Sequence, residues 1–247
     1  MQSVTLLPGR DKQGRAETFS ALTLGRGELC TIVGNTGSGK SRLIKDVEQL
    51  ACGDSVTGRR ILLDGRAAPP EERQALSSGL VAHLGQSMRF VLDVTVAEFL
   101  ALHAKCRGRE ADVDQVLALV NEVTPEPVAA GQNLNLLSGG QARALMIADV
   151  ALICDSPVVL VDEIENAGVD KEKALGLLQS RDKLVLVVTH DPHTALMAGR
   201  RVVMENGAVS AVVERTPAET ALYEELGRDY RLHRTYQTLL RKGEHLV

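Results

Sequence analysis

The fold of this chain is decided by one stretch, Gly34-Asn35-Thr36-Gly37-Ser38-Gly39-Lys40-Ser41. It matches G-x-x-x-x-G-K-[ST], the pattern of a phosphate-binding loop. The apolar run 29–33 before it predicts a short buried strand, and the residues from Ser41 onward have helical spacing. Glycines let the backbone wrap closely around phosphates, and the N-terminus of the following helix adds partial positive charge. The plain alternative is a glycine-rich turn with an exposed lysine.

The phosphate-loop interpretation assigns a role to the two residues that end the stretch. Lys40 would reach the β- and γ-phosphates of a nucleotide, and the Ser41 hydroxyl would bind Mg²⁺. The backbone N–H groups of the loop would point inward at the phosphate oxygens. We therefore predict a nucleotide site at the end of a strand.

The composition is that of one large α/β domain with an aliphatic core. Of the 247 residues, 44% are apolar, but only 2% are aromatic and none is tryptophan. The net charge of −4, without a long basic run, argues against direct nucleic-acid binding. The N-terminus lacks the pattern of a signal peptide, and the apolar runs are too short to span a membrane, so we expect a cytoplasmic protein. The four cysteines have no C-x-x-C spacing and read as reduced thiols.

The order of apolar patterns predicts an α/β protein with a mostly parallel sheet. Residues up to about 33 look β-rich, further strands are expected at 61–63, 79–84, 158–161 and 184–188, and helices at 93–122, after Ser138, and at 171–178. Such alternation favours a parallel sheet covered by helices. We expect a catalytic core formed by residues 1–87 and 138–215, an inserted helical subdomain at 88–137, and a helical tail at 216–247. The tail would pack on the core or on a dimer, with a regulatory role as the alternative.

A second glycine-rich turn opens the helix that follows the helical insert. It reads Leu137-Ser138-Gly139-Gly140-Gln141. A Ser-Gly-Gly turn at a helix N-terminus is a second possible anion site, since its backbone N–H groups and the helix dipole both favour negative charge. The alternative is an ordinary helix cap with a flexible glycine pair.

Polar side chains end three of the expected strands. The run 158–161 is followed by Asp162 and Glu163, which suits a carboxylate that supports Mg²⁺ and a second one that deprotonates an attacking water. The run 184–188 is followed by His190 after one threonine, where an imidazole could donate to a γ-phosphate. Gln86 also ends a strand but indicates nothing alone. The alternatives are an acidic strand end facing solvent and a structural histidine.

Taken together, these motifs resemble the nucleotide-binding subunit of ATP-binding cassette (ABC) proteins over roughly residues 25–207. The phosphate loop, the strand-end glutamine, the helical insert, Leu-Ser-Gly-Gly-Gln, Asp-Glu and the histidine follow in the order of that family. The resemblance implies a P-loop fold of ABC type, with an N-terminal antiparallel β portion, that hydrolyses ATP as a head-to-tail dimer around two ATP-Mg²⁺.

The resemblance also implies a role for each matching residue. The ATP-binding residues would be Gly34, Asn35, Thr36, Gly37, Ser38, Gly39, Lys40 and Ser41. The residues that bind the γ-phosphate held by the other subunit would be Ser138, Gly139, Gly140 and Gln141. Mg²⁺ would be held by Ser41, Gln86 and Asp162. Catalysis would depend on Glu163 as general base, on His190 as the switch histidine and on Gln86.

The chain departs from the family pattern at three places. No aromatic residue suited to stack on adenine lies upstream of the phosphate loop, since Phe19 is too near it, so the base would be recognised by other contacts and GTP use stays open. The segment Ile164–Asp170 is one residue longer than usual. Asp149 stands where an arginine often occurs. None of these changes removes a group that hydrolysis needs.

Three functions follow from these residues. The first is an ATPase subunit that powers a membrane transporter, lying at the inner face of the membrane through a separate permease that docks near residues 87–95. The second is an ATPase with soluble partners, in cofactor assembly, metalloenzyme activation or repair. The third is a nucleotide-gated structural module without turnover, against which the intact Glu163 and His190 argue.

Overall fold

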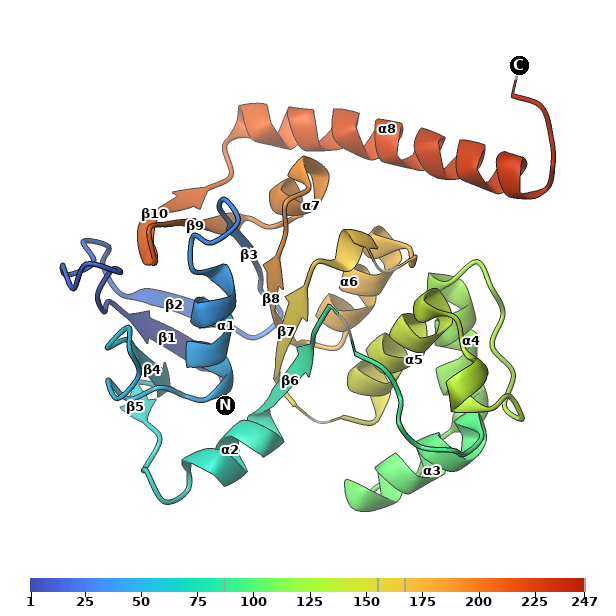
Figure 1. The fold of residues 1–247 in the computed structure, drawn as a ribbon, viewed down its shortest axis with the longest axis horizontal. Coiled ribbons are helices and arrows are strands. Elements are labelled where there is room, and N and C mark those ends of the chain that lie inside the picture. The colour runs from blue at the N-terminus through green and yellow to red at the C-terminus, as the bar shows by residue number, and fades with distance from the viewer. Residues whose placement is uncertain (87, 155, 167, 247) are drawn as a thin grey trace.

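The computed structural model describes residues 1–86, 88–154, 156–166 and 168–246, and its main sheet is mostly parallel (Figure 1). Within these residues the sheet has six strands in the order β10-β9-β3-β8-β7-β6. The strands are β3 (Leu29–Val33), β6 (Val81–Leu84), β7 (Val158–Asp162), β8 (Leu184–Val188), β9 (Arg200–Glu205) and β10 (Ala208–Glu214). Only the β9–β10 pair is antiparallel. The predicted α/β fold with a mostly parallel sheet is confirmed.

The central strands are apolar throughout because both faces of the sheet are covered. All five residues of β8 are buried, as are Val158–Val161 of β7. Continuous apolar runs of this kind are typical of parallel strands between helical layers. The burial of these strands fixes where their carboxyl ends, and the polar residues that follow, can lie.

A second, antiparallel sheet is formed near the N-terminus, in the order β2-β1-β4-β5. Its strands are β1 (Ser3–Leu7), β2 (Leu22–Gly25), β4 (Arg60–Leu63) and β5 (Arg66–Ala67). Its buried side chains alternate along β1 and β2 and belong to the same core cluster as those of α1 (Lys40–Glu48). The β-rich N-terminal portion and the strand near residue 61 were both predicted from alternation and turn residues.

The remaining helices cover the sheet or form a separate layer beside it (Figure 1). They are α2 (Arg73–Leu80), α3 (Val96–Cys106), α4 (Val113–Val123), α5 (Gly139–Leu152), α6 (Lys171–Ser180), α7 (Pro192–Met197) and α8 (Pro217–Arg241), with short 3₁₀ turns η1 (Leu134–Leu136) and η2 (Ile164–Asn166). Capping boxes start α3, α5 and α8 at Thr95, Ser138 and Thr216. Each box satisfies N–H groups that a helix start leaves without intrahelical partners.

Asp149, which departs from the family pattern, joins two of these helices. Its side chain is 8% exposed, and its Oδ1 lies 2.7 Å from Nδ1 of His103 on α3. The pair forms an acid–imidazole contact between α3 and α5.

The structure corrects one expected boundary and adds one hairpin. Residues 79–80 end α2 rather than begin a strand, so β6 starts only at Val81. The helical region expected at 93–122 consists of α3 and α4, divided near Gly108, whose φ of 65° lies in the left-handed region. The β9–β10 hairpin was not predicted, because β9 depends on parallel pairing with the distant β3. Among the described residues no helix is long and apolar enough to cross a membrane.

Candidate active site

The predicted site residues lie where the parallel strands end. The phosphate loop follows β3, Gln86 follows β6, Glu163 follows β7 and His190 follows β8. In the register of the sheet, Val161 pairs with Leu84 and with Val187, so these three strands end at one edge. Ligands of open α/β sheets bind at the carboxyl ends of the strands.

The phosphate loop is held in place by the β9–β10 turn. The Gly207 N–H donates to the Ser38 carbonyl at 2.8 Å. Gly39 has φ of 106°, and a Cβ there would lie 2.9 Å from the Gly207 Cα. At Gly34, with φ of 148°, a Cβ would lie 2.4 Å from the Met204 carbonyl oxygen. Both positions therefore require glycine, because of their backbone conformation and their close neighbours.

The start of α1 has the features of an anion site. Gly39 caps the helix without a side-chain hydrogen bond, and no acidic residue lies in the first turn. The Ser38 hydroxyl is buried and has no hydrogen-bond partner among the described residues. The Lys40 ammonium donates to the carbonyls of Gly34 at 2.7 Å and Asn35 at 3.1 Å. Uncapped N–H groups, an unpaired buried hydroxyl and an adjacent ammonium fit the phosphates of a nucleotide.

Glu163 is fixed in an unusual conformation between Gln86 and His190. Its backbone φ of 48° lies in the left-handed region, which residues other than glycine and asparagine rarely adopt. Its N–H donates to the Val188 carbonyl at 3.0 Å. The Gln86 amide donates to Glu163 Oε2 at 2.5 Å. His190 Nε2 lies 3.7 Å from Glu163 Oε1. The three predicted catalytic residues are therefore brought together, although they are far apart in the sequence.

Asp162 lies beside Glu163 in a setting that suits a divalent cation. Burial raises the pKa of Asp162, and the neighbouring Glu163 carboxylate raises it further. Burial lowers the pKa of Lys40, while the charges of Glu163 and Asp162 oppose that shift. A partly buried carboxylate whose charge is disfavoured would be stabilised by Mg²⁺, which prefers oxygen ligands.

Of the residues predicted to bind Mg²⁺, only Asp162 has a carboxylate. Among the described residues no three His, Cys, Asp or Glu side chains converge as a metal site. The hydroxyl of Ser41, the amide of Gln86 and Asp162 would therefore bind Mg²⁺ together with nucleotide oxygens. Such sharing is common for this ion, which usually keeps substrate phosphates and water among its ligands.

The Ser-Gly-Gly-Gln turn does not face the phosphate loop of its own chain. Ser138 caps α5 by accepting from the Gln141 N–H at 3.2 Å, and Gln141 Oε1 accepts from the Ser138 N–H at 2.9 Å. The Ser138 hydroxyl donates to Glu126 at 2.7 Å. In Figure 1, α5 and α1 lie on opposite sides of β7 and β8. The turn is therefore separated from the phosphate loop of its own chain by these strands.

Two further residues contact the site: Arg143, which was not predicted, and Glu165, which belongs to the longer segment 164–170. Arg143, 5% exposed, donates to the carbonyls of Leu84 at 3.1 Å and Asp162 at 2.9 Å, and also to that of Gly85. Glu165 Oε1 accepts from the Thr189 hydroxyl at 2.9 Å and from the His190 N–H at 3.0 Å. The sequence signal for Arg143 is a charge near the start of a mostly apolar helix, and for Glu165 it is the longer segment 164–170.

The side of the loop where a base would lie has no aromatic contact in the described structure. Phe19 packs against the core cluster of the antiparallel sheet instead. The Lys12 ammonium donates to the Gly37 carbonyl at 2.7 Å, and a Cβ on Gly207 would lie 2.8 Å from the Lys12 Cγ. A lysine thus occupies the surface beside the loop.

Comparison with known proteins agrees with this geometry. Residues 19–166 match the family model described as ABC transporter. The uncharacterised ABC transporter ATP-binding protein MJ0121 of Methanocaldococcus jannaschii is 47% identical over the whole chain and 95% of its own length. The macrolide export ATP-binding/permease protein MacB of Bradyrhizobium diazoefficiens is 31% identical over 81% of this chain, which covers only 31% of that protein.

A solved structure shares the fold. It is the dimeric ATP-binding cassette MJ0796 in a post-hydrolysis state bound to ADP and phosphate, and it superposes with a TM-score of 0.63. The match covers 85% of this chain and 98% of that one, at 23% sequence identity. At this identity the likeness concerns the fold alone.

Proposed function

This chain belongs to the ABC transporter ATP-binding family and is an ATPase of that type, and from this premise we propose that Glu163 is its general base in a head-to-tail dimer. The observation that supports the role is the position of Glu163, which is held between the Gln86 amide and the His190 imidazole at the end of β7. A carboxylate in hydrogen-bond reach of a bound water could accept its proton as the water attacks the γ-phosphate.

In this proposal, the other residues at the carboxyl ends of the parallel strands bind and orient the nucleotide. Residues 34–41 and the start of α1 hold the phosphates, with Lys40 released from the loop carbonyls to reach the phosphate oxygens. Ser41, Asp162 and Gln86 hold Mg²⁺, which when bound neutralises charge on the phosphate oxygens. His190 donates a hydrogen bond to the γ-phosphate and changes its distance from Glu163 to do so.

Dimerisation completes each site. The start of α5 lies on the far side of β7 and β8 from the phosphate loop, which supports the assignment of residues 138–141 to ATP held by a second chain. The first N–H groups of α5 and the glycines of its turn supply that contact. A Cβ on Gly139 would meet nothing within 4 Å, so the turn is open to an approaching ligand.

The glutamate-to-glutamine variant tests this function. Glu163→Gln should lower kcat by roughly a thousandfold, because general-base catalysis supplies about 10²–10⁴-fold. It should still bind ATP-Mg²⁺ and form a stable dimer, since the amide keeps the shape of the site. Single-turnover hydrolysis and light scattering after size-exclusion chromatography measure both effects. Normal hydrolysis by this variant would show that Glu163 is not the base.

We further propose that the ATPase powers a transporter by docking a membrane permease beside Gln86. Val91 is 91% exposed and Met88 is 46% exposed, an unusual pairing of apolar residues at a surface. Met88 lines a groove of about 780 Å³ together with Gln86, Phe90 and Gly139, and Val91 follows Phe90 in the chain. Of the predicted dock 87–95, Ser87 lies outside the described residues. A permease segment there would place the chain at the inner membrane face.

A further inference from the structure

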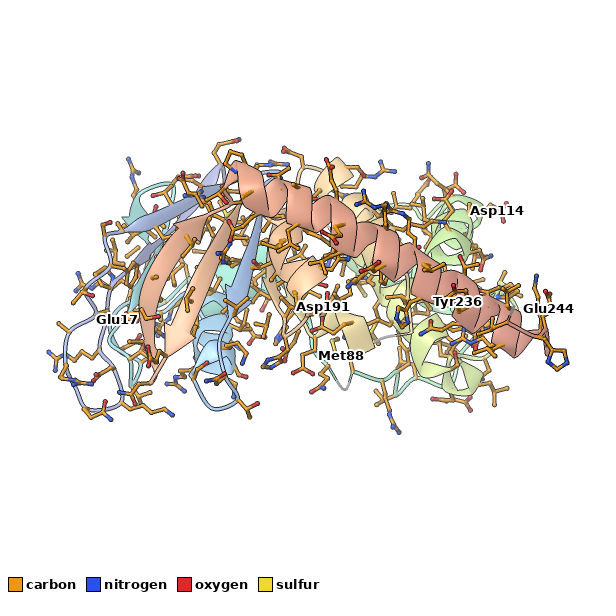
Figure 2. All side chains as sticks on the ribbon, turned by 90° about the horizontal axis from the view of Figure 1, so that it is seen from above. Glu17, Met88, Asp114, Asp191, Tyr236 and Glu244 are labelled. Carbon is orange, nitrogen blue, oxygen red and sulfur yellow. The ribbon has the colours of Figure 1, made fainter. Side chains whose placement is uncertain are left out.

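The C-terminal helix α8 contacts the starts of two helices that follow the catalytic strand ends. Helix α6 begins at Lys171, after the segment that follows Glu163, and α7 begins at Pro192, directly after the His190 segment. Figure 1 shows α8 lying across α7 and α6. Figure 2, seen from above, places Asp191 beside α8. The helix is therefore next to both segments that the proposed mechanism uses.

Lys171 and Asp191 join these two segments directly. The Lys171 side chain is 5% exposed and its ammonium forms an ion pair with Asp191. Asp191 Oδ2 also accepts from the Thr194 N–H and hydroxyl, each at 2.7 Å, and so caps α7. Burial raises the pKa of Asp191, but the hydrogen bonds from Lys171 and Thr194 outweigh it and hold the pKa below its ordinary value. The residue next to His190 is thus ionised and held by a buried ammonium.

Tyr230 of α8 contacts both the backbone and the side chain of Lys171. The Tyr230 hydroxyl accepts from the Lys171 N–H at 3.2 Å, which satisfies an N–H at the start of α6. The Lys171 ammonium also lies 4.5 Å from the centre of the Tyr230 ring, in cation–π range. One turn further along α8, Arg234 forms an ion pair of 2.5 Å with Asp170. The start of α6 therefore depends on α8.

A second contact fixes α8 on α7. The His193 ring is 5.1 Å from the Tyr223 ring, nearly parallel to it, and 5.3 Å from the Tyr230 ring. Gly227 allows this approach, because a Cβ there would lie 3.3 Å from His193 Nε2. Tyr230 thus touches α6 and α7 at once, and a change in its position would reach both segments.

We infer that Lys171 and Tyr230 are positioning residues for His190. Through these two residues, α8 holds the switch histidine next to Glu163. The inference rests on the proposed roles of His190 and Glu163. With the Lys171–Asp191 bond intact, the segment 189–191 is tied to the segment 164–170. Without it, Asp191 keeps a partly buried charge that lost its main partner, and His190 is no longer held toward the site. Neither Lys171 nor Tyr230 touches the reacting atoms.

Steady-state ATP hydrolysis by variants of Lys171 tests the inference. Lys171→Met should lower kcat by about tenfold or more with KM changed by less than about threefold, since a misplacement near 1 Å can cost about a hundredfold in rate. Lys171→Arg keeps a cation for Asp191 and should restore most of kcat. The matched control is Lys173→Met, an exposed lysine on the same helix, which should hydrolyse like the wild type.

Variants of Tyr230 keep the test valid if Lys171→Met does not fold. Tyr230→Phe removes only the hydroxyl that accepts from Lys171 and should lower kcat by about threefold, as expected from loss of a bond worth about 0.5–1.5 kcal/mol. Tyr230→Leu removes the ring as well and should lower kcat further. Tyr236→Leu, on an exposed part of the same helix, is the control. Thermal melting of each variant checks that the domain is folded.

The outcomes separate this inference from the proposed function. If folded Lys171→Met and Tyr230→Leu both keep wild-type kcat while Glu163→Gln is inactive, the positioning role is wrong and the base assignment stands. If both raise KM in proportion while kcat is unchanged, α8 affects nucleotide binding and the inference is equally wrong. If Glu163→Gln is fully active, the proposed base fails independently of α8.

Discussion

At the scale of single residues, the longer segment after Glu163 contains Glu165, which contacts the histidine segment. One oxygen of this carboxylate accepts from both the Thr189 hydroxyl and the His190 N–H. Its other oxygen is buried and has no hydrogen-bond partner among the described residues. Glu165 therefore holds the histidine segment at Thr189 and His190, whereas Lys171 holds it at Asp191.

Replacement of Glu165 separates its hydrogen bonds from its charge. Glu165→Ala should lower kcat by about tenfold, which corresponds to about 1.4 kcal/mol of lost transition-state stabilisation. Glu165→Gln keeps an acceptor oxygen and should retain most of the activity. Both are compared by steady-state hydrolysis with Glu122→Ala, an exposed glutamate on α4. Wild-type turnover in folded Glu165→Ala would refute the role of these bonds.

At the scale of elements, the contact between α7 and α8 should depend on pH through His193. The ring is 3% exposed, and neither nitrogen has a hydrogen-bond partner among the described residues, although Nε2 lies 3.4 Å from Glu172 Oε1. Burial lowers the pKa of His193 and the charges of Lys171 and Arg231 lower it too, while Glu172 and Asp191 oppose them. The folded contact therefore favours the neutral ring.

The sign of the pH effect follows from this lowered pKa. The unfolded chain binds a proton near the ordinary value of 6.5, and the folded chain only at lower pH. The stabilisation is complete above 6.5 and is lost as the pH falls through the folded value. Between about pH 8 and pH 5.5, the Tm of the wild type should fall more than that of His193→Phe. The difference in Tm should be about 2–4 °C for each kcal/mol of unfolding free energy that the wild type loses.

The matched control for this pH effect is another histidine of the same region. His233 is exposed on α8, so His233→Phe should keep the pH dependence of the wild type. Differential scanning calorimetry of the three proteins at both pH values measures the difference. An equal loss of Tm in wild type and His193→Phe would mean that other groups cause the acid sensitivity.

At the scale of the whole molecule, the exposed apolar residues beside Gln86 predict a membrane partner. Tagged Glu163→Gln protein with ATP-Mg²⁺, purified from detergent-solubilised native cells, should retain a polytopic membrane protein that mass spectrometry identifies. Adding Val91→Asp should abolish that retention, because a charge would then replace the most exposed apolar side chain of the proposed dock. Val56→Asp is the control, since Val56 is also apolar and is 82% exposed elsewhere on the molecule.

The alternative partners give a different result in the same purification. Recovery of a soluble protein that stimulates hydrolysis, or of a homodimer alone, would contradict the permease dock and favour an ATPase with soluble partners. The sites of hydrolysis would be unaffected by that outcome, since they depend on the strand ends and on dimerisation. The partner and the chemistry are thus tested separately.

The secondary structure could be predicted where it depends on local pattern. Strands β7 and β8 are continuous apolar runs, and α5 follows a Ser-Gly-Gly turn that caps it, so both types of element were predicted close to their observed bounds. The end of helix α2 was misread as the start of a strand because Gly79 and Leu80 run directly into the apolar residues of β6. Strand β9 depends on its register with β3, which local sequence does not encode.

The sequence by itself determined the chemistry of the chain: a phosphate loop, carboxylates and a histidine after apolar strands, and a second anion turn. These groups are recognisable because each motif is a few adjacent residues whose backbone conformation and strand position are local properties. Only the tertiary structure decided how they are held. The bonds of Glu165 to His190, of Arg143 to three strand-end carbonyls, and of Lys171 to Asp191 under Tyr230 join residues distant in the chain. Such contacts arise from the register of the sheet and the path of α8, which no short stretch of sequence contains.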